Sequence, residues 1–252
     1  SINFSFGNDD DFDILKSNYS LTLLDNSLTT FWIAYVYSTN LIYKIMQYIN
    51  FFLSTFFTIL IINAIGIFLF PDMPINLILI IFIIIIVDIA APPGIVEGNF
   101  CNKILTQYKY TKKTPIIDNK LFLNIIIQIF SKVGILVYLM MKGDNIFGIE
   151  SDRQLEHNVW NDNNGYHLTV LFCVLFFMIL IHLILAVLEV NNNFVLYGFN
   201  AFILVVVQLC IVNYGGNITR TKPLSQNDLL KCFGFASLTI PFYYLLKVIM
   251  IT

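Results

Sequence analysis

Three ionisable side chains interrupt the most apolar parts of this sequence, and their positions suggest chemistry inside a membrane. They are Asp88, Lys132 and His182. A charge at the centre of a bilayer costs at least about 2.5–3.5 kcal/mol on insertion scales. Each of these residues therefore needs a partner, a wet cavity or a functional reason to be there.

Asp88 is followed after four residues by a double proline. Pro92 has no N–H, so in a continuing helix the carbonyl of Asp88 loses its partner, and Pro93 does the same to the carbonyl of Ile89. The result is one carboxylate and two free carbonyl oxygens at one depth. Hard cations such as calcium prefer oxygen ligands. We therefore predict a helix break at Pro92 and Pro93 and a cation-binding metal site at Asp88 and Ile89. In the alternative interpretation, Asp88 marks the end of a membrane span and meets water.

Lys132 and His182 are candidate charge partners within the membrane. Lys132 could snorkel, face a wet cavity, neutralise Asp88 or pack against backbone carbonyls. His182 could be a neutral residue bonded to a neighbouring helix, or a ligand for a proton or ion. The sequence contains no Gly-rich phosphate loop, His/Cys cluster or nucleophile arrangement. No catalytic residue is therefore predicted in this chain.

The composition explains why these charges stand out. Of 252 residues, 58% are hydrophobic and 12% are charged, about half the charged fraction of a typical soluble domain. We predict an integral, multi-pass, all-α membrane protein with six helical spans. The predicted spans are residues 44–70, 75–91, 121–142, 167–190, 194–213 and 231–251. The formal net charge of −2 gives no reason to expect a nucleic-acid partner.

Loop charges predict the orientation. Residues 92–120 carry five lysines, whereas residues 143–166 are mainly acidic. The positive-inside rule places the lysine-rich loop in the cytosol, and six spans then place both termini there.

The N-terminal residues are polar and contain one strand-like pattern. Ile2, Phe4 and Phe6 alternate with polar residues and end at Gly7. A single strand leaves its backbone edges unpaired, so we expect it to need partners that this chain does not contain. The stretch 13–24 is expected to form a short helix or another strand. Some 40 residues are too few for a domain, so something else must complete this piece.

Several short motifs follow one another in a recognisable order. The N-terminal motifs are Ser1-Ile-Asn-Phe-Ser-Phe-Gly7, Asp11-Phe-Asp13-Ile-Leu-Lys16 and Leu23-Leu-Asp25-Asn26-Ser-Leu28, and the later ones include Lys113-Thr-Pro115-Ile-Ile117, Gly143-Asp-Asn-Ile-Phe147-Gly-Ile149-Glu-Ser151-Asp-Arg153 and Tyr214-Gly215-Gly216. This order resembles the C-terminal membrane half, helices five to ten, of P-type cation ATPases, and is closest to plasma-membrane-type calcium pumps. In the resemblance, Asp88 falls on the aspartate of the sixth family helix.

The resemblance implies an architecture and an activity. Residues 1–40 would be the end of a cytosolic phosphorylation-domain-like segment, and residues 41–252 a six-helix transmembrane domain. It implies ATP-driven cation transport, with calcium the ion, in the plasma membrane or an internal calcium-store membrane. Magnesium and ATP would act at cytosolic domains absent from this chain, supplied by the N-terminal half of a longer pump or by a separate chain. This chain alone would have no ATPase activity.

The ion-binding positions depart from the family pattern. Ile84 stands where the family has an asparagine, Leu53 falls near another such position, and of the usual ligand set only Asp88 remains. An alternative is therefore a degenerate, catalytically inactive pump-like protein serving as a structural or regulatory partner subunit. A further alternative is an unrelated six-helix channel or carrier.

Overall fold

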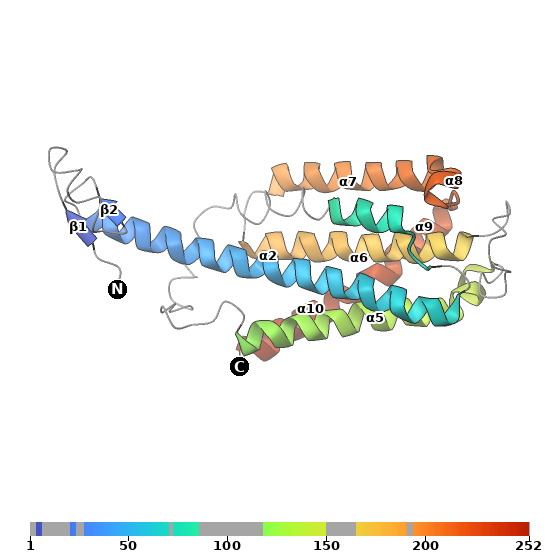
Figure 1. Ribbon diagram of the computed structural model, residues 1–252, viewed down its shortest axis with the longest axis horizontal. Coiled ribbons are helices and arrows are strands. Elements are labelled where there is room, and N and C mark those ends of the chain that lie inside the picture. The colour runs from blue at the N-terminus through green and yellow to red at the C-terminus, as the bar shows by residue number, and fades with distance from the viewer. Residues whose placement is uncertain are drawn as a thin grey trace. The chain divides into compact units, whose positions relative to one another are not determined.

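Helices dominate the computed structural model of the protein (Figure 1). The structure describes residues 4–6, 21–23, 28–70, 73–85, 118–149, 165–190 and 194–251. The chain divides into two compact units, residues 1–44 with 100–114, and residues 45–99 with 115–252. The second unit contains Lys132 and His182.

Two short strands pair within the first unit. β1 (Phe4–Phe6) lies parallel to β2 (Leu21–Leu23), with Phe4 opposite Leu21 and Phe6 opposite Leu23. The prediction that the first strand needs a partner outside the chain is therefore wrong. The sequence Leu-Thr-Leu alternates apolar and polar residues as β1 does, so the two strands can form a matching pair. Of the stretch 13–24, residues 21–23 are strand, and residues 13–20 and 24 lie outside the described part.

The first long helix, α2 (Leu28–Leu69), has 42 residues. At 1.5 Å per residue it reaches about 63 Å, roughly twice the hydrocarbon thickness of a bilayer. It contains the predicted span 44–70 apart from its last residue, but it begins 16 residues before that span. Gly66 is its first glycine, and no proline interrupts it, so the helix continues through its polar first part.

A second helical segment, residues 77–85, follows α2 in the sequence and packs against its end. Asn63 accepts a hydrogen bond from the backbone N–H of Ile75 through its side-chain oxygen, at 3.2 Å, and Pro74 packs where a side chain on Gly66 would stand. The predicted span 75–91 is thus helical over 77–85. Residues 86–91 and the predicted break at Pro92 and Pro93 lie outside the described residues.

The next three helices coincide closely with predicted spans. They are α5 (Asn119–Phe147), α6 (Tyr166–Val190) and α7 (Phe194–Tyr214). Asp118 caps α5 by accepting the N–H of Asn119 at 2.7 Å, and Gly148 ends it in the left-handed conformation, with φ of 65°.

The last predicted span, 231–251, is two helices rather than one. After the four-residue α8 (Gly216–Thr219), α9 (Gln226–Ser237) ends before Leu238, and α10 (Thr239–Ile251) follows. Pro241 explains the interruption, because its missing N–H would leave the carbonyl of Ser237 without a partner in a continuous helix.

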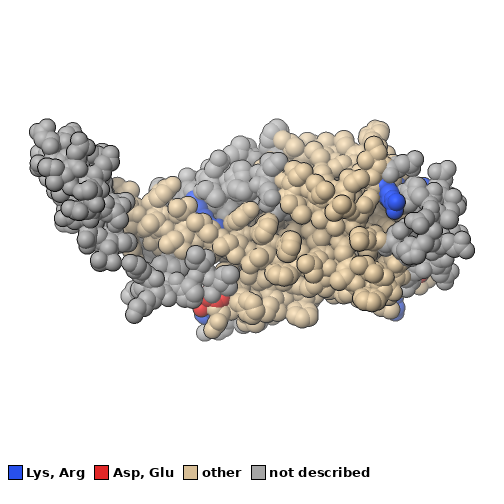
Figure 2. Space-filling view, viewed as in Figure 1, with Lys and Arg blue, Asp and Glu red and all other residues tan. Residues whose placement is uncertain are grey.

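α6 is the core of the second unit, and its neighbours are apolar on their outer faces. Every residue from Val170 to Leu183 is buried, and α6 packs against α5, α7, α9 and α10. Large apolar side chains such as Phe68, Phe130 and Phe202 are exposed on other elements. Figure 2 shows almost no charge on this apolar surface. Such a surface matches hydrocarbon rather than water.

Among the described residues, three helices are long and apolar enough to cross a membrane: Thr29–Leu69, Asn119–Phe147 and Tyr166–Leu188. The apolar helix Asn200–Tyr214 is shorter. The structure therefore agrees with a helical membrane bundle, while six spans and the phosphorylation-domain-like segment stay predictions.

Candidate functional site

The structure brings together two of the predicted site residues. Lys132 Nζ of α5 lies 2.9 Å from His182 Nδ1 of α6. Asp88 and Ile89, the predicted cation ligands, lie outside the described residues, so that site and its contact with Lys132 stay predictions. The candidate site that can be built from described side chains is therefore the surrounding of Lys132 and His182.

Regular spacing on the helices positions these side chains. On α5, Asn124, Gln128 and Lys132 recur every four residues and form one buried polar line. His182 lies near the middle of the predicted span in α6. Ser54 of α2 completes the group, with its Oγ 3.3 Å from Lys132 Nζ. Three helices thus supply the polar cluster Ser54–Lys132–His182.

The hydrogen bonds of the cluster indicate where its protons are. The Ser54 hydroxyl donates to the carbonyl of Phe51 at 3.0 Å, so its oxygen is available to accept from Lys132. When Lys132 is the donor in its contact with His182 Nδ1, that nitrogen carries a lone pair and the ring proton of His182 is on Nε2. Ser54 Oγ also lies 3.4 Å from Nδ1, within the same cluster.

Because the cluster is buried, repulsion between charges within it is only weakly screened by solvent. Lys132 is 2% exposed and His182 is 4% exposed. Two positive charges 2.9 Å apart would repel by about 6 kcal/mol at an effective dielectric constant of 20. The partners of Lys132 Nζ among the described residues, Ser54 and His182, bring no negative charge to offset this. The pair therefore carries one positive charge at most.

Aromatic rings and a small void surround the histidine. The ring of Phe51 meets His182 edge-on at a centroid distance of 5.1 Å, and that of Tyr243 does so at 5.8 Å. A void of about 10 Å³ is lined by Gln128, Ser131, Lys132, His182, Leu185, Thr239 and Tyr243. Within the described structure, Gln128 Oε1 and His182 Nε2 are buried without a hydrogen-bond partner.

α2 contributes a longer polar stripe on its buried side. Asn50, Ser54, Thr55 and Thr58 are each at most 2% exposed. Asn50 Oδ1 and Thr55 Oγ1 have no hydrogen-bond partner within the described structure. Sequence reasoning missed Ser54, Asn50 and Gln128. The available signal was the four-residue spacing 50-54-58 on α2 and 124-128-132 on α5 within otherwise apolar helices.

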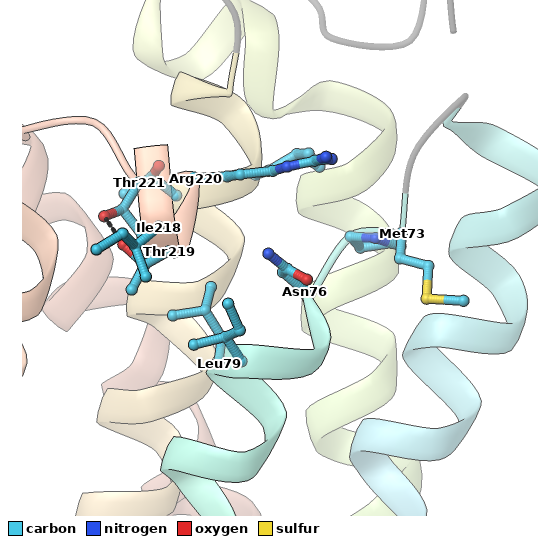
Figure 3. A pocket seen from close by; sticks show the side chains of 11 residues that line it. Met73, Asn76, Leu79, Ile218, Thr219, Arg220 and Thr221 are labelled. Carbon is cyan, nitrogen blue, oxygen red and sulfur yellow. Dashed lines mark hydrogen bonds between the residues drawn. The ribbon is translucent and has the colours of Figure 1, made fainter. Parts of the chain in front are cut away.

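A larger cavity of about 460 Å³ lies between the segment 73–79, the start of α6 and residues 218–221. In Figure 3, the Asn76 and Arg220 side chains extend toward this space. Arg220 has a left-handed backbone, with φ of 53°, which turns the chain sharply after α8. The backbone N–H of Lys222 donates to Thr169 Oγ1 at 3.0 Å and ties this turn to α6.

Within the described residues, no group of three or more His, Cys, Asp or Glu side chains could hold a metal ion. Amide and hydroxyl oxygens are the available polar ligands in the buried stripes. A calcium ion is coordinated by six to eight oxygens, and these usually include carboxylates. A calcium site would therefore need at least Asp88 in addition to the amide and hydroxyl oxygens of the stripes.

Known proteins match almost the whole chain. A family model described as "Cation transporting ATPase, C-terminus" matches residues 72–249. The "Calcium-transporting ATPase 3, plasma membrane-type" of Oryza sativa subsp. japonica is 22% identical over 248 residues, which cover 94% of this chain and 23% of that protein. The "Plasma membrane calcium-transporting ATPase mca-1" of Caenorhabditis elegans is 23% identical over 239 residues, which cover 90% and 19%. The chain thus spans about a fifth of the length of these relatives.

Proposed function

This chain belongs to the cation-transporting ATPase family, of which it carries the C-terminal part, and we propose that it forms the membrane-embedded part of an ATP-driven cation transporter. Because the chain spans about a fifth of its relatives, the ATP-driven activity would belong to a longer assembly. The remaining N-terminal half, or a separate chain that supplies it, would bind Mg²⁺ and ATP.

The observation that carries this proposal is a polar interior inside an apolar-surfaced bundle. Ser54, Lys132 and His182 meet from three helices and are all nearly inaccessible to solvent. Buried ionisable residues in a membrane protein are expensive and mark ion or proton pathways. A merely structural bundle would be more stable with apolar residues at these places.

Calcium is the cation we propose, on the names of the two relatives and the chemistry of Asp88. A carboxylate beside free carbonyl oxygens at a helix break suits a hard cation. The ligand set is small. A positive charge at Lys132 would also disfavour a second cation nearby. We therefore propose one calcium ion held by Asp88 and the carbonyl of Ile89.

α2 is the element we propose to couple the bundle to cytosolic domains. It is a single uninterrupted helix from Leu28 to Leu69, and its buried polar stripe includes Ser54 of the cluster. A displacement of this helix would move Ser54 relative to Lys132 and His182 in the cluster. The 460 Å³ cavity near Asn76 and Arg220 would then be the opening on the outer side. The membrane would be the plasma membrane or an internal calcium-store membrane.

The test is calcium-dependent phosphoenzyme formation from ATP in the longer protein that contains this chain. Wild-type protein should form a phosphoenzyme only with calcium present, and Asp88→Asn should abolish it. Asp118→Asn is the matched control, since asparagine also caps a helix and Asp118 is exposed. Phosphoenzyme formation indifferent to calcium in the wild type would refute the proposal. Unchanged calcium dependence in Asp88→Asn would remove Asp88 from the site. The inactive-partner alternative rests on the departures at Ile84 and Leu53, and the comparisons give it no support.

A further inference from the structure

We propose that the Lys132–His182 pair is a binding site for one exchangeable proton in the membrane interior, and that a single bound water links His182 to Gln128. The proton-site part stands on the geometry of the described residues alone. Its consequence for transport, given below, rests on the proposed function.

The geometry allows the pair one extra proton and no more. Lys132 Nζ and His182 Nδ1 are 2.9 Å apart, and both side chains are at least 96% buried. At this distance a charged ammonium and a charged imidazolium would repel each other without solvent to screen them. The pair therefore titrates as a unit, and its proton belongs to both groups.

The described side chains around the pair do not determine whether it is protonated. α2 presents the Ser54 hydroxyl and the Phe51 ring, and α10 presents Thr239 and Tyr243 beside the void. None of these described neighbours is a carboxylate or a cationic side chain. A neutral pair keeps both bonds from Nζ, because an uncharged amine still has two N–H groups to donate to Ser54 and Nδ1.

The void beside the pair has the size and chemistry of a water site. Its volume of about 10 Å³ corresponds to about one water molecule. His182 Nε2 and Gln128 Oε1, which both line it, lack a partner in the described structure. With the proton of His182 on Nε2, one water can accept from Nε2 and donate to Gln128 Oε1. Gln128 Nε2 in turn donates to Asn124 Oδ1 at 2.9 Å, so the hydrogen bonds continue toward the N-terminal end of α5.

In the transporter proposed above, the occupied proton site would oppose a cation in the same bundle. Loss of the proton removes one positive charge from the interior, which favours cation entry. Cation affinity should therefore rise with pH, by at most about tenfold per pH unit for one proton. The Lys132→Met variant should lose this dependence.

The experiment is nitrogen-15 NMR of the full 252-residue chain in lipid bilayers with labelled histidine. The chain has three histidines, and a His182→Gln variant assigns the signal of interest. His167 serves as a folding reporter in every sample, because its Nε2 lies 2.9 Å from the carbonyl of Leu139. Lys142→Met, an exposed position on the same helix, is the matched control for Lys132→Met.

In wild type and Lys142→Met, His182 should show an unprotonated Nδ1 and a protonated Nε2 near neutral pH. The Lys132→Met variant should lose this fixed tautomer and show a charged imidazolium at a pH where the wild type shows none. Overlapping titrations in wild type and Lys132→Met, with His167 native in both, would overturn the shared proton site. Failure of calcium-dependent phosphorylation would instead count against the proposed function alone.

The water is tested in the same samples. A magnetisation-transfer signal between water and the Nε2 proton of His182 should be present in the wild type. It should vanish in Gln128→Leu, whose apolar side chain fills the void and removes the accepting oxygen. Absence of the signal from the wild type, or its persistence in Gln128→Leu, would overturn the bound water.

Discussion

Lys132 and His182 lie 50 positions apart in the sequence, yet their Nζ and Nδ1 atoms are 2.9 Å apart inside the helical bundle. The contact joins the middle of α5 to the middle of α6 and includes Ser54 of α2. The three residues bond to one another through Ser54 Oγ, Lys132 Nζ and His182 Nδ1, whereas His182 Nε2 has no hydrogen-bond partner in the described structure. This polar centre is the feature that distinguishes the bundle from a purely structural one.

The first prediction concerns how the helical segment 77–85 is held against α2. Adding a methyl group at Gly66 would place it against Pro74, so Gly66→Ala should destabilise the protein by about 1–3 kcal/mol. Gly134→Ala is the matched control, since its added Cβ meets nothing within 4 Å and alanine favours the helix. Thermal unfolding in detergent, followed by circular dichroism, measures both. Equal stability of the two variants would show that Gly66 does not determine this packing.

The second prediction concerns the pH dependence of the start of α9. Partial burial raises the pKa of Asp228, but hydrogen bonds from Ser225, Tyr166 and Lys231 outweigh it and hold that pKa below the ordinary value of 3.8. The stabilisation is therefore present above about pH 4 and is lost as the pH falls through the lowered value.

Asp228→Asn should accordingly reduce stability by roughly 1–2 kcal/mol at pH 7. The lower end of that range is expected, because the Lys231 side chain is 44% exposed and its ion pair is screened by water. Unfolding measured from pH 7 to pH 3 should show the gap to wild type closing below about pH 4. A gap that does not change with pH would contradict a charged Asp228 as its cause.

Several of these features could be predicted from the sequence, and others could not. Long apolar runs predicted α6 and α7 to within one residue at each end and the central part of α5. The family resemblance was confirmed by the family match. Lys132 and His182 stood out because charges are rare in apolar runs. Their contact with each other could not be predicted from the sequence, because it depends on the rotation of α5 and α6 about their axes. That rotation is set by packing between residues that are far apart in the sequence.

Local patterns also misled in two places. β1 was expected to need a partner from elsewhere, but a parallel partner lay in the same chain, within the stretch 13–24 that was expected to form a short helix or another strand. The predicted span 231–251 is broken at Leu238, although Pro241 was visible in the sequence. Ser54 and Gln128 were missed because a hydroxyl or amide in an apolar helix is unremarkable until a neighbouring helix is known to supply a charge.

The third prediction tests the orientation inferred from loop charge. Cys101 belongs to the lysine-rich stretch 92–120, which is predicted to be a cytosolic loop, whereas Cys173 and Cys232 are buried. A membrane-impermeant maleimide added to intact cells should leave Cys101 unmodified and should react with it after permeabilisation. Cys210→Ser removes the exposed helical thiol as a source of background. Labelling of Cys101 from outside intact cells would reverse the orientation, and a Cys101→Ser sample identifies the signal.

The central claim is that this chain is the membrane part of a cation transporter, and ATP-driven calcium uptake tests it most directly. Sealed inside-out vesicles containing the longer protein would be given ATP and radioactive calcium. We predict uptake by the wild type and by Asp118→Asn, none by Asp88→Asn, and none in any sample without ATP. Wild-type vesicles that take up no more calcium than vesicles lacking the protein would contradict the account.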